Sequence, residues 1–141
     1  MSWNEDRIAE YLQRTVIPVR LSFLRPDGHP AVASFWYLHE GTSLWCATQD
    51  DAFVVRCLRA DPRCAFEIAG DEPPYRGVRA KGLATVLPER GEEILRRLIE
   101  RYLGTDSPEL QRFLLGRSDD EVAIELRPER RTTWDFSDRM E

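Results

Sequence analysis

The sequence contains little lysine, histidine and cysteine, and these shortages exclude several kinds of site. Lys81 is the only lysine among 20 basic residues, and every other basic residue is arginine. The three cysteines form no Cys-x-x-Cys pair, and His29 and His39 lie apart from them, so the spacing that zinc requires is missing. We therefore expect no metal site, three buried reduced thiols and two ordinary surface histidines in turns.

Long apolar runs are also missing. No stretch of about 18 uncharged apolar residues is present, so no membrane-spanning helix is predicted. The first residues carry Glu5, Asp6 and Glu10 instead of the apolar segment of a secretory signal, which favours a cytoplasmic location. The net charge of −5 disfavours general binding to nucleic acid, but it is compatible with a local basic pocket for one phosphate.

What the sequence does contain is the composition of a soluble domain, with 42% hydrophobic and 32% charged residues in a chain of 141. We expect one domain over residues 1–141. Apolar residues recur in places with a period of two, typical of strands, and in others with helical spacing. The predicted strands cover residues 17–24, 31–38, 43–48, 63–69, 75–87, 121–127 and 131–136. The predicted helices cover residues 3–14, 50–60, 88–102 and 107–115.

Short connections predict how these elements pair. The first two strands form a hairpin around a turn at residues 25–30, and residues 43–48 follow as the third strand of an antiparallel meander. Ser2 and Glu5 are expected to cap the first helix, and Asp50 or Asp51 the second. The predicted fold is mainly β with helices (α+β), a small barrel of six to seven antiparallel strands, because closure removes exposed strand edges.

No catalytic motif is present, neither a nucleophile elbow nor a phosphate-binding glycine loop nor a zinc-protease motif. Aromatic residues instead gather on predicted strands, at residues 35–37, Trp45, Trp134 and Phe136. Such residues form a core or a dimer interface, or they form the wall of a site for a flat conjugated ligand. Gly82, within a long predicted strand, indicates a bend or the close approach of a ligand.

Several segments, taken in order, resemble a known family. Residues 20–30 (RLSFLRPDGHP) and 32–37 (VASFWY) are similar to the first hairpin of the pyridoxamine 5′-phosphate oxidase-like family of flavin-binding split barrels. Further segments resemble the family's later strands and its helix-to-strand junction, and they follow in the family's order. They are residues 45–48 (WCAT), 58–66 (LRADPRCAF), 78–84 (VRAKGLA) and 134–136 (WDF). The likeness spans residues 16–136, which makes the set more specific than any one segment.

The resemblance implies a homodimeric split barrel that binds FMN, or a deazaflavin in some branches, at the interface of the two subunits. It also implies a set of cofactor contacts. The isoalloxazine ring would lie against Val32, Ser34, Phe35 and Trp36. The phosphate or ribityl chain would approach Ala47, Thr48, Gln49 and Arg56. The partner subunit would supply Tyr75, Arg76, Lys81 and Trp134.

One position departs from the family pattern. Val54 stands where the family usually has a basic residue directed at the phosphate, so weakened FMN binding is expected. Free N–H groups at the start of the helix after Asp51 are still expected to face a phosphate. The sequence therefore predicts an FMN-dependent oxidoreductase acting on an unassigned small molecule. The alternative is a non-enzymatic barrel dimer that binds a flavin, a deazaflavin or haem.

Overall fold

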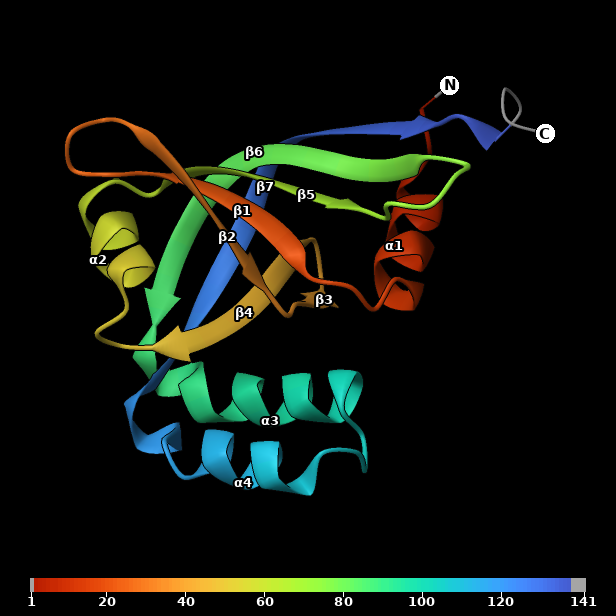
Figure 1. Ribbon diagram of the computed structural model, residues 1–141. Coiled ribbons are helices and arrows are strands. Elements are labelled where there is room, and N and C mark those ends of the chain that lie inside the picture. The colour runs from red at the N-terminus through yellow and green to blue at the C-terminus, as the bar shows by residue number, and fades with distance from the viewer. Residues whose placement is uncertain (1, 138–141) are drawn as a thin grey trace.

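The computed structural model of the protein describes residues 2–137 and shows a curled antiparallel sheet surrounded by helices (Figure 1). The sheet order is β2-β1-β5-β6-β7-β4-β3, which confirms the predicted split barrel, mainly β with helices. The strands are β1 (Val19–Leu24), β2 (Pro30–Phe35), β3 (Leu38–Glu40), β4 (Ser43–Gln49), β5 (Arg63–Ala69), β6 (Arg76–Leu87) and β7 (Glu121–Asp135). The helices are α1 (Glu5–Arg14), α2 (Phe53–Ala60), α3 (Gly91–Tyr102) and α4 (Pro108–Leu115), with 3-10 turns η1 (Pro88–Arg90) and η2 (Ser118–Asp120). Among residues 2–137, no helix has the length and hydropathy needed to span a membrane.

The longest strand, β7, joins the two halves of the sheet. It pairs with β6 along nearly its whole length and with β4 through its first six residues. The prediction of two separate final strands was wrong, because Pro128 lies within β7 at a shift in register between Lys81 and Gly82. Proline is tolerated at such an irregularity, where no ladder hydrogen bond is needed from its nitrogen.

Gly82 is required by this irregularity, not by a ligand. A Cβ atom at Gly82 would lie 2.1 Å from the carbonyl oxygen of Arg127 on the neighbouring strand. The backbones of β6 and β7 therefore approach too closely here for any side chain. Of the two alternatives expected for Gly82, a bend or the close approach of a ligand, this contact between strands accounts for the glycine without a ligand.

The predicted meander is also wrong, because the strand expected over residues 31–38 breaks at Trp36 and Tyr37. The chain then crosses from β2, at one edge of the sheet, to β3 at the other edge. Tyr37 makes the break, since its backbone N–H donates to the hydroxyl of Tyr102 (3.1 Å) and not to a neighbouring strand. Its own buried hydroxyl donates to the carbonyl oxygens of Leu12 (2.8 Å) and Thr15 (2.6 Å). The C-terminal end of α1 is thereby attached to the barrel.

The predicted helix caps were misplaced by a few residues. Asn4, and not Ser2, caps α1, and its Oδ1 accepts from the backbone N–H of Arg7 at 2.8 Å. The N-cap of α2 is Ala52, so neither Asp50 nor Asp51 has this role. His39 lies in β3 and is half-buried, contrary to the expected surface turn, whereas His29 is exposed. The three cysteines are free and buried, as predicted.

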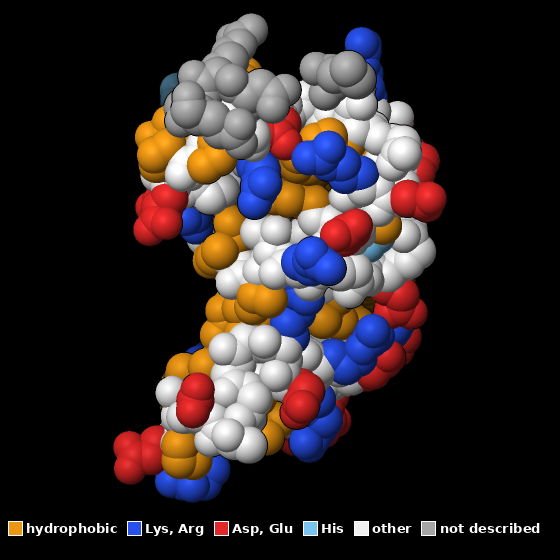
Figure 2. Space-filling view, turned by 90° about the vertical axis from the view of Figure 1, so that its right-hand side faces the viewer, with side chains coloured by type: hydrophobic (Ala, Val, Ile, Leu, Met, Phe, Trp, Pro, Cys, Tyr) orange, Lys and Arg blue, Asp and Glu red, His pale blue; other side chains and the backbone are white. Residues whose placement is uncertain are grey.

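Helix α3 packs on the sheet, and α4 lies on its far side (Figure 1). Ile94, Leu95, Leu98 and Ile99 of α3 are buried against the sheet. Ion pairs one helical turn apart on α3 join Glu92 to Arg96 (3.0 Å) and Glu93 to Arg97 (3.5 Å). In contrast, α4 has no buried residue. Figure 2 shows a hollow bordered by hydrophobic side chains above this helical layer.

Gly91 sets the distance between α3 and β7. A Cβ atom at this position would lie 1.8 Å from the carbonyl oxygen of Glu121. The φ angle of Gly91 is −57°, a helical value that alanine adopts readily, so the only obstacle to alanine is the neighbouring backbone.

We predict that Gly91→Ala lowers the free energy of unfolding by about 2–3 kcal/mol, because α3 must move away from β7. Urea denaturation measures the change. The control is Gly70→Ala, since nothing lies within 4 Å of a Cβ at Gly70. If Gly91→Ala instead stabilises the protein, as an unobstructed helical position would allow, the close packing of α3 on β7 is incorrect.

Candidate functional site

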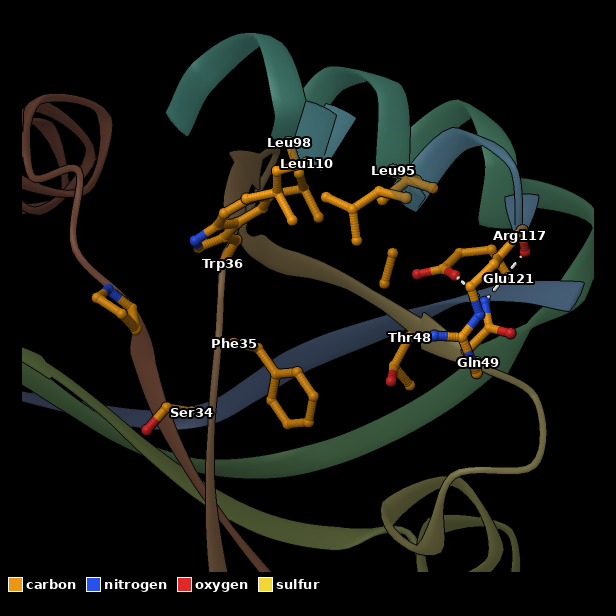
Figure 3. Close-up of a pocket in the computed structure, with 13 residues that line it drawn as sticks. Ser34, Phe35, Trp36, Thr48, Gln49, Leu95, Leu98, Leu110, Arg117 and Glu121 are labelled. Carbon is orange, nitrogen blue, oxygen red and sulfur yellow. Dashed lines mark hydrogen bonds between the residues drawn. The ribbon is translucent and has the colours of Figure 1, made fainter. Parts of the chain in front are cut away.

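A cavity of about 440 Å³ lies between the sheet and the two helices α3 and α4 (Figure 3). Its volume falls within the range of sites that hold small molecules and cofactors. The sheet side is formed by the end of β2, the residue that follows it, and the end of β4. The lining residues are Pro18, Ser34, Phe35, Trp36, Ala47, Thr48, Gln49, Leu95, Leu98, Leu110, Leu114, Arg117 and Glu121.

Most of the cavity wall is apolar. Leu95 and Leu98 of α3 form one side, and Leu110 of α4, 42% exposed, forms the outer rim. The indole of Trp36 is held in place by the ring of Tyr102, with ring centroids 5.1 Å apart and planes within 10°. An aromatic wall fixed from behind suits a flat ligand, because no rotamer has to be ordered when the ligand binds.

Polar groups gather at the opposite end, where β4 ends and β7 begins. The Nε2 atom of Gln49 donates to Oε2 of Glu121 (2.5 Å) and to the backbone oxygen of Arg117 (3.1 Å). In Figure 3 the side chains of Arg117 and Glu121 project into the cavity beside Thr48. The cavity therefore has an aromatic and aliphatic body and one polar end that carries both signs of charge.

The carboxyl group of Glu121 is perturbed by its position. Desolvation by burial raises the pKa of Glu121, while the hydrogen bond from Gln49 and the charge of Arg117 act in the opposite direction. Burial prevails because the carboxylate loses water that one amide donor does not replace. The pKa of this carboxyl group is therefore held above its ordinary value of 4.5 at this end of the cavity.

The structure brings six of the predicted cofactor contacts together in this cavity and leaves six outside it, among them Tyr75, which directly precedes β6. Those inside are Ser34, Phe35, Trp36, Ala47, Thr48 and Gln49. Val32, 70% exposed, lies on edge strand β2, with its side chain away from the cavity lining. Arg56 is exposed on α2, with its guanidinium carbon 5.8 Å from the centre of the Phe53 ring.

Three predicted contacts lie on β6 and β7. Lys81 is exposed and faces Arg130 in the register of the two strands. The ring of Trp134 lies under the guanidinium of Arg79, at 4.5 Å. The backbone oxygen of Arg76 accepts from the hydroxyl of Tyr11 at 3.4 Å, and Arg76 pairs with Asp135, at the end of the β6–β7 ladder opposite to Glu121. These are the residues that the resemblance assigned to the partner subunit.

Sequence reasoning missed the helical half of the site. Leu95 and Leu98 belong to the buried stripe of α3, and both also line the cavity. The signal that could have indicated the contribution of α4 to the site is its short apolar sequence, which leaves Leu110 and Phe113 exposed. Arg117 and Glu121 flank a predicted loop, and no pattern in the sequence places them together.

Val54 is not a vacant phosphate-binding position. Its side chain is 6% exposed and belongs to the main core, so it points into the barrel and away from any ligand. The weakened FMN binding expected from Val54 stays a prediction, and a lysine here would be buried, so we do not expect it to restore a phosphate contact.

Comparison with known proteins agrees with this arrangement. The family model of pyridoxamine 5′-phosphate oxidase matches residues 5–135, so the chain belongs to that family. Among curated proteins, none matches the sequence significantly.

Solved structures extend the likeness. A conserved hypothetical protein from Mycobacterium tuberculosis has 26% identity and a TM-score of 0.79, over 94% of this chain and 85% of that one. An F420 reductase also has 26% identity, with a TM-score of 0.72 over 87% and 94% of the chains. The haem storage protein of Vibrio cholerae shares the fold at 18% identity, with a TM-score of 0.69 over 93% of each chain.

We predict that Val54→Lys lowers the free energy of unfolding by about 2–4 kcal/mol without strengthening flavin binding, because it buries an unpaired charge. Thermal or urea denaturation measures the loss. The control is Val16→Lys, the same chemical change at an exposed site, which is expected to shift stability by about 0.5 kcal/mol or less. Equal effects of the two variants would mean that Val54 is not in the core.

A second prediction concerns the pH dependence of stability. Because the pKa of Glu121 is raised in the folded state, the unfolded chain releases this proton first as pH rises past the ordinary value of 4.5. The free energy of unfolding therefore falls as the pH rises from 4.5 toward the higher pKa that Glu121 has in the folded state. Glu121→Gln removes this cost, so its stability relative to wild type is expected to increase between about pH 3.5 and pH 7. Urea denaturation at both pH values tests this, and parallel pH profiles would contradict it.

Proposed function

We propose that the protein is an oxidoreductase that binds a flavin-type cofactor, FMN or a deazaflavin, in the cavity between the sheet and α3–α4. The observation that carries this proposal is the cavity itself. It combines a fixed aromatic wall at Phe35 and Trp36 with polar groups at the end of β4. Membership of the pyridoxamine 5′-phosphate oxidase family supports the same class of cofactor.

The residues present fit such a group. The aromatic and leucine side chains suit the faces of a planar tricyclic ring, which is largely apolar. Thr48 and Gln49 suit the hydroxyls of a ribityl chain, because both side chains offer hydrogen-bonding groups at the strand end. The polar and apolar parts of the cavity thus match the polar and apolar parts of the cofactor.

The chemistry would be divided between cofactor and chain. A bound flavin or deazaflavin supplies hydride transfer. The chain binds and orients the ring through Phe35 and Trp36, and the leucines of α3 and α4 exclude water from it. Glu121 lies at the polar end of the cavity, where burial raises the pKa of its carboxyl group.

Two observations bear on the choice between FMN and a deazaflavin. The likeness to an F420 reductase at 26% identity supports a deazaflavin. The family pattern has a basic residue for the phosphate of FMN at the position of Val54, whereas this chain has a buried valine there. Titration of the purified protein with each cofactor, followed by fluorescence, determines which one binds more tightly.

We also propose that the working form is a homodimer. Val32, Lys81 and Arg130 are exposed, and the strand register places them on one face of the sheet, through Ser22 and Ala65. A partner on this face would cover the exposed Val32 and bring these residues to the interface. Sedimentation measurements with and without cofactor test this assembly.

A cavity-filling variant is the sharpest test of the site. We predict that Ala47→Phe lowers flavin affinity by at least about tenfold, because the new ring occupies the cavity that Ala47 lines. The control is Ala60→Phe at the exposed end of α2. Fluorescence titration with FMN and with a deazaflavin measures both variants.

The proposal fails if the wild-type protein binds neither cofactor, or if Ala47→Phe binds as well as wild type. Binding of a cofactor that a nicotinamide donor or dithionite cannot reduce would instead support the non-enzymatic barrel that sequesters its ligand.

A further inference from the structure

Arg117 is the only basic residue among the described residues that line the cavity. It follows Gly116, the C-cap of α4, and its backbone N–H donates to the carbonyl oxygen of Leu114 (3.2 Å). Its own backbone oxygen accepts from Gln49 at 3.1 Å. The residue is therefore fixed from both α4 and β4, and in Figure 3 its guanidinium lies beside Thr48.

The guanidinium of Arg117 is available to a ligand. It takes part in none of the ion pairs formed among residues 2–137, although many other arginines of this chain do. One face of the guanidinium packs over the ring of Phe113, and the Cζ atom of Arg117 lies 5.3 Å from the centre of that ring. This contact holds the side chain without using its N–H donors, which suits binding of an anion.

The basic positions that the family pattern assigns to the phosphate do not line this cavity. Val54 is in the core, and Arg56 is exposed on α2 and packs on Phe53. A phosphate attached to a ring that lies against Trp36 needs a cation that points into the same cavity. Among residues 2–137, only Arg117 meets that condition.

We propose that Arg117, together with the hydroxyl of Thr48, binds the phosphate of the cofactor and replaces the basic residue missing at Val54. This inference rests on the proposed function. The ligand class is a phosphate ester on a ribityl chain, whether the monoester of FMN or the diester of a deazaflavin. Planar guanidinium donors form charge-assisted hydrogen bonds with phosphate oxygens, often in pairs.

Glu121 opposes this binding. Its carboxylate would repel a phosphate at the same end of the cavity, and it lies close enough to Arg117 for their charges to interact. Removal of the two charges should therefore have opposite effects, which a nonspecific loss of structure could not produce.

The experiment compares cofactors with and without phosphate. Fluorescence titration measures the dissociation constants of FMN and riboflavin, and of a deazaflavin with and without its phosphodiester tail. Wild type is expected to favour the phosphorylated member of each pair by about tenfold or more. Arg117→Gln reduces this preference by about tenfold, Arg117→Lys retains part of it, and Glu121→Gln increases it. Riboflavin affinity stays close to wild type in Arg117→Gln.

Arg112→Gln is the matched control, because Arg112 is an exposed arginine of α4 outside the cavity lining. Arg56→Gln tests the competing site on α2. A preference lost in Arg56→Gln but kept in Arg117→Gln would overturn the inference, as would equal binding of FMN and riboflavin by wild type. Each of these results leaves the proposed function intact, since a flavin still binds. Failure of all four compounds to bind overturns the proposed function together with the inference.

Discussion

The pairing of β7 with both β6 and β4 is the constraint on which the rest of the structure depends. One strand of 15 residues connects two halves of the sheet that share no other direct pairing. The register shift at Gly82 and Pro128 interrupts the ladder and lets this long strand bend with the curled sheet. Without that bend the ends of β2 and β4 would not face the same helical layer, and the cavity would have only one wall.

The cavity is a joint product of the sheet and the α3–α4 pair. Helix α3 is held by burial of its apolar stripe and by the close contact of Gly91 with Glu121. The same residue, Glu121, then turns its side chain into the cavity and binds Gln49. Neighbouring atoms of Glu121 therefore set both the packing of α3 and the polar character of the cavity, so its carboxylate is desolvated although it faces the cavity.

Elements with a clear periodicity could be predicted from the sequence, and long-range connections could not. Strand β5 was placed at residues 63–69 by alternation alone, because its neighbours bury one face throughout. The break at Tyr37 was missed because it depends on Tyr102, which is 65 residues away in the chain. In the site, the resemblance pointed to β2 and β4, which carry sequence motifs. The contribution of α4 depends on a tertiary position that no local pattern encodes.

The hydrogen bonds of Tyr37 and Tyr102 have a consequence for local motion. Tyr102 donates to the carbonyl oxygen of Ile17 at 2.8 Å and stacks on Trp36, while Arg101 donates to the same oxygens of Leu12 and Thr15 as Tyr37 does. These contacts link the end of α1, the end of α3 and the aromatic wall, so we expect their amides to exchange with deuterium together. Helix α4 has no buried residue and takes no part in these contacts, so we expect its amides to exchange at a lower free energy of opening.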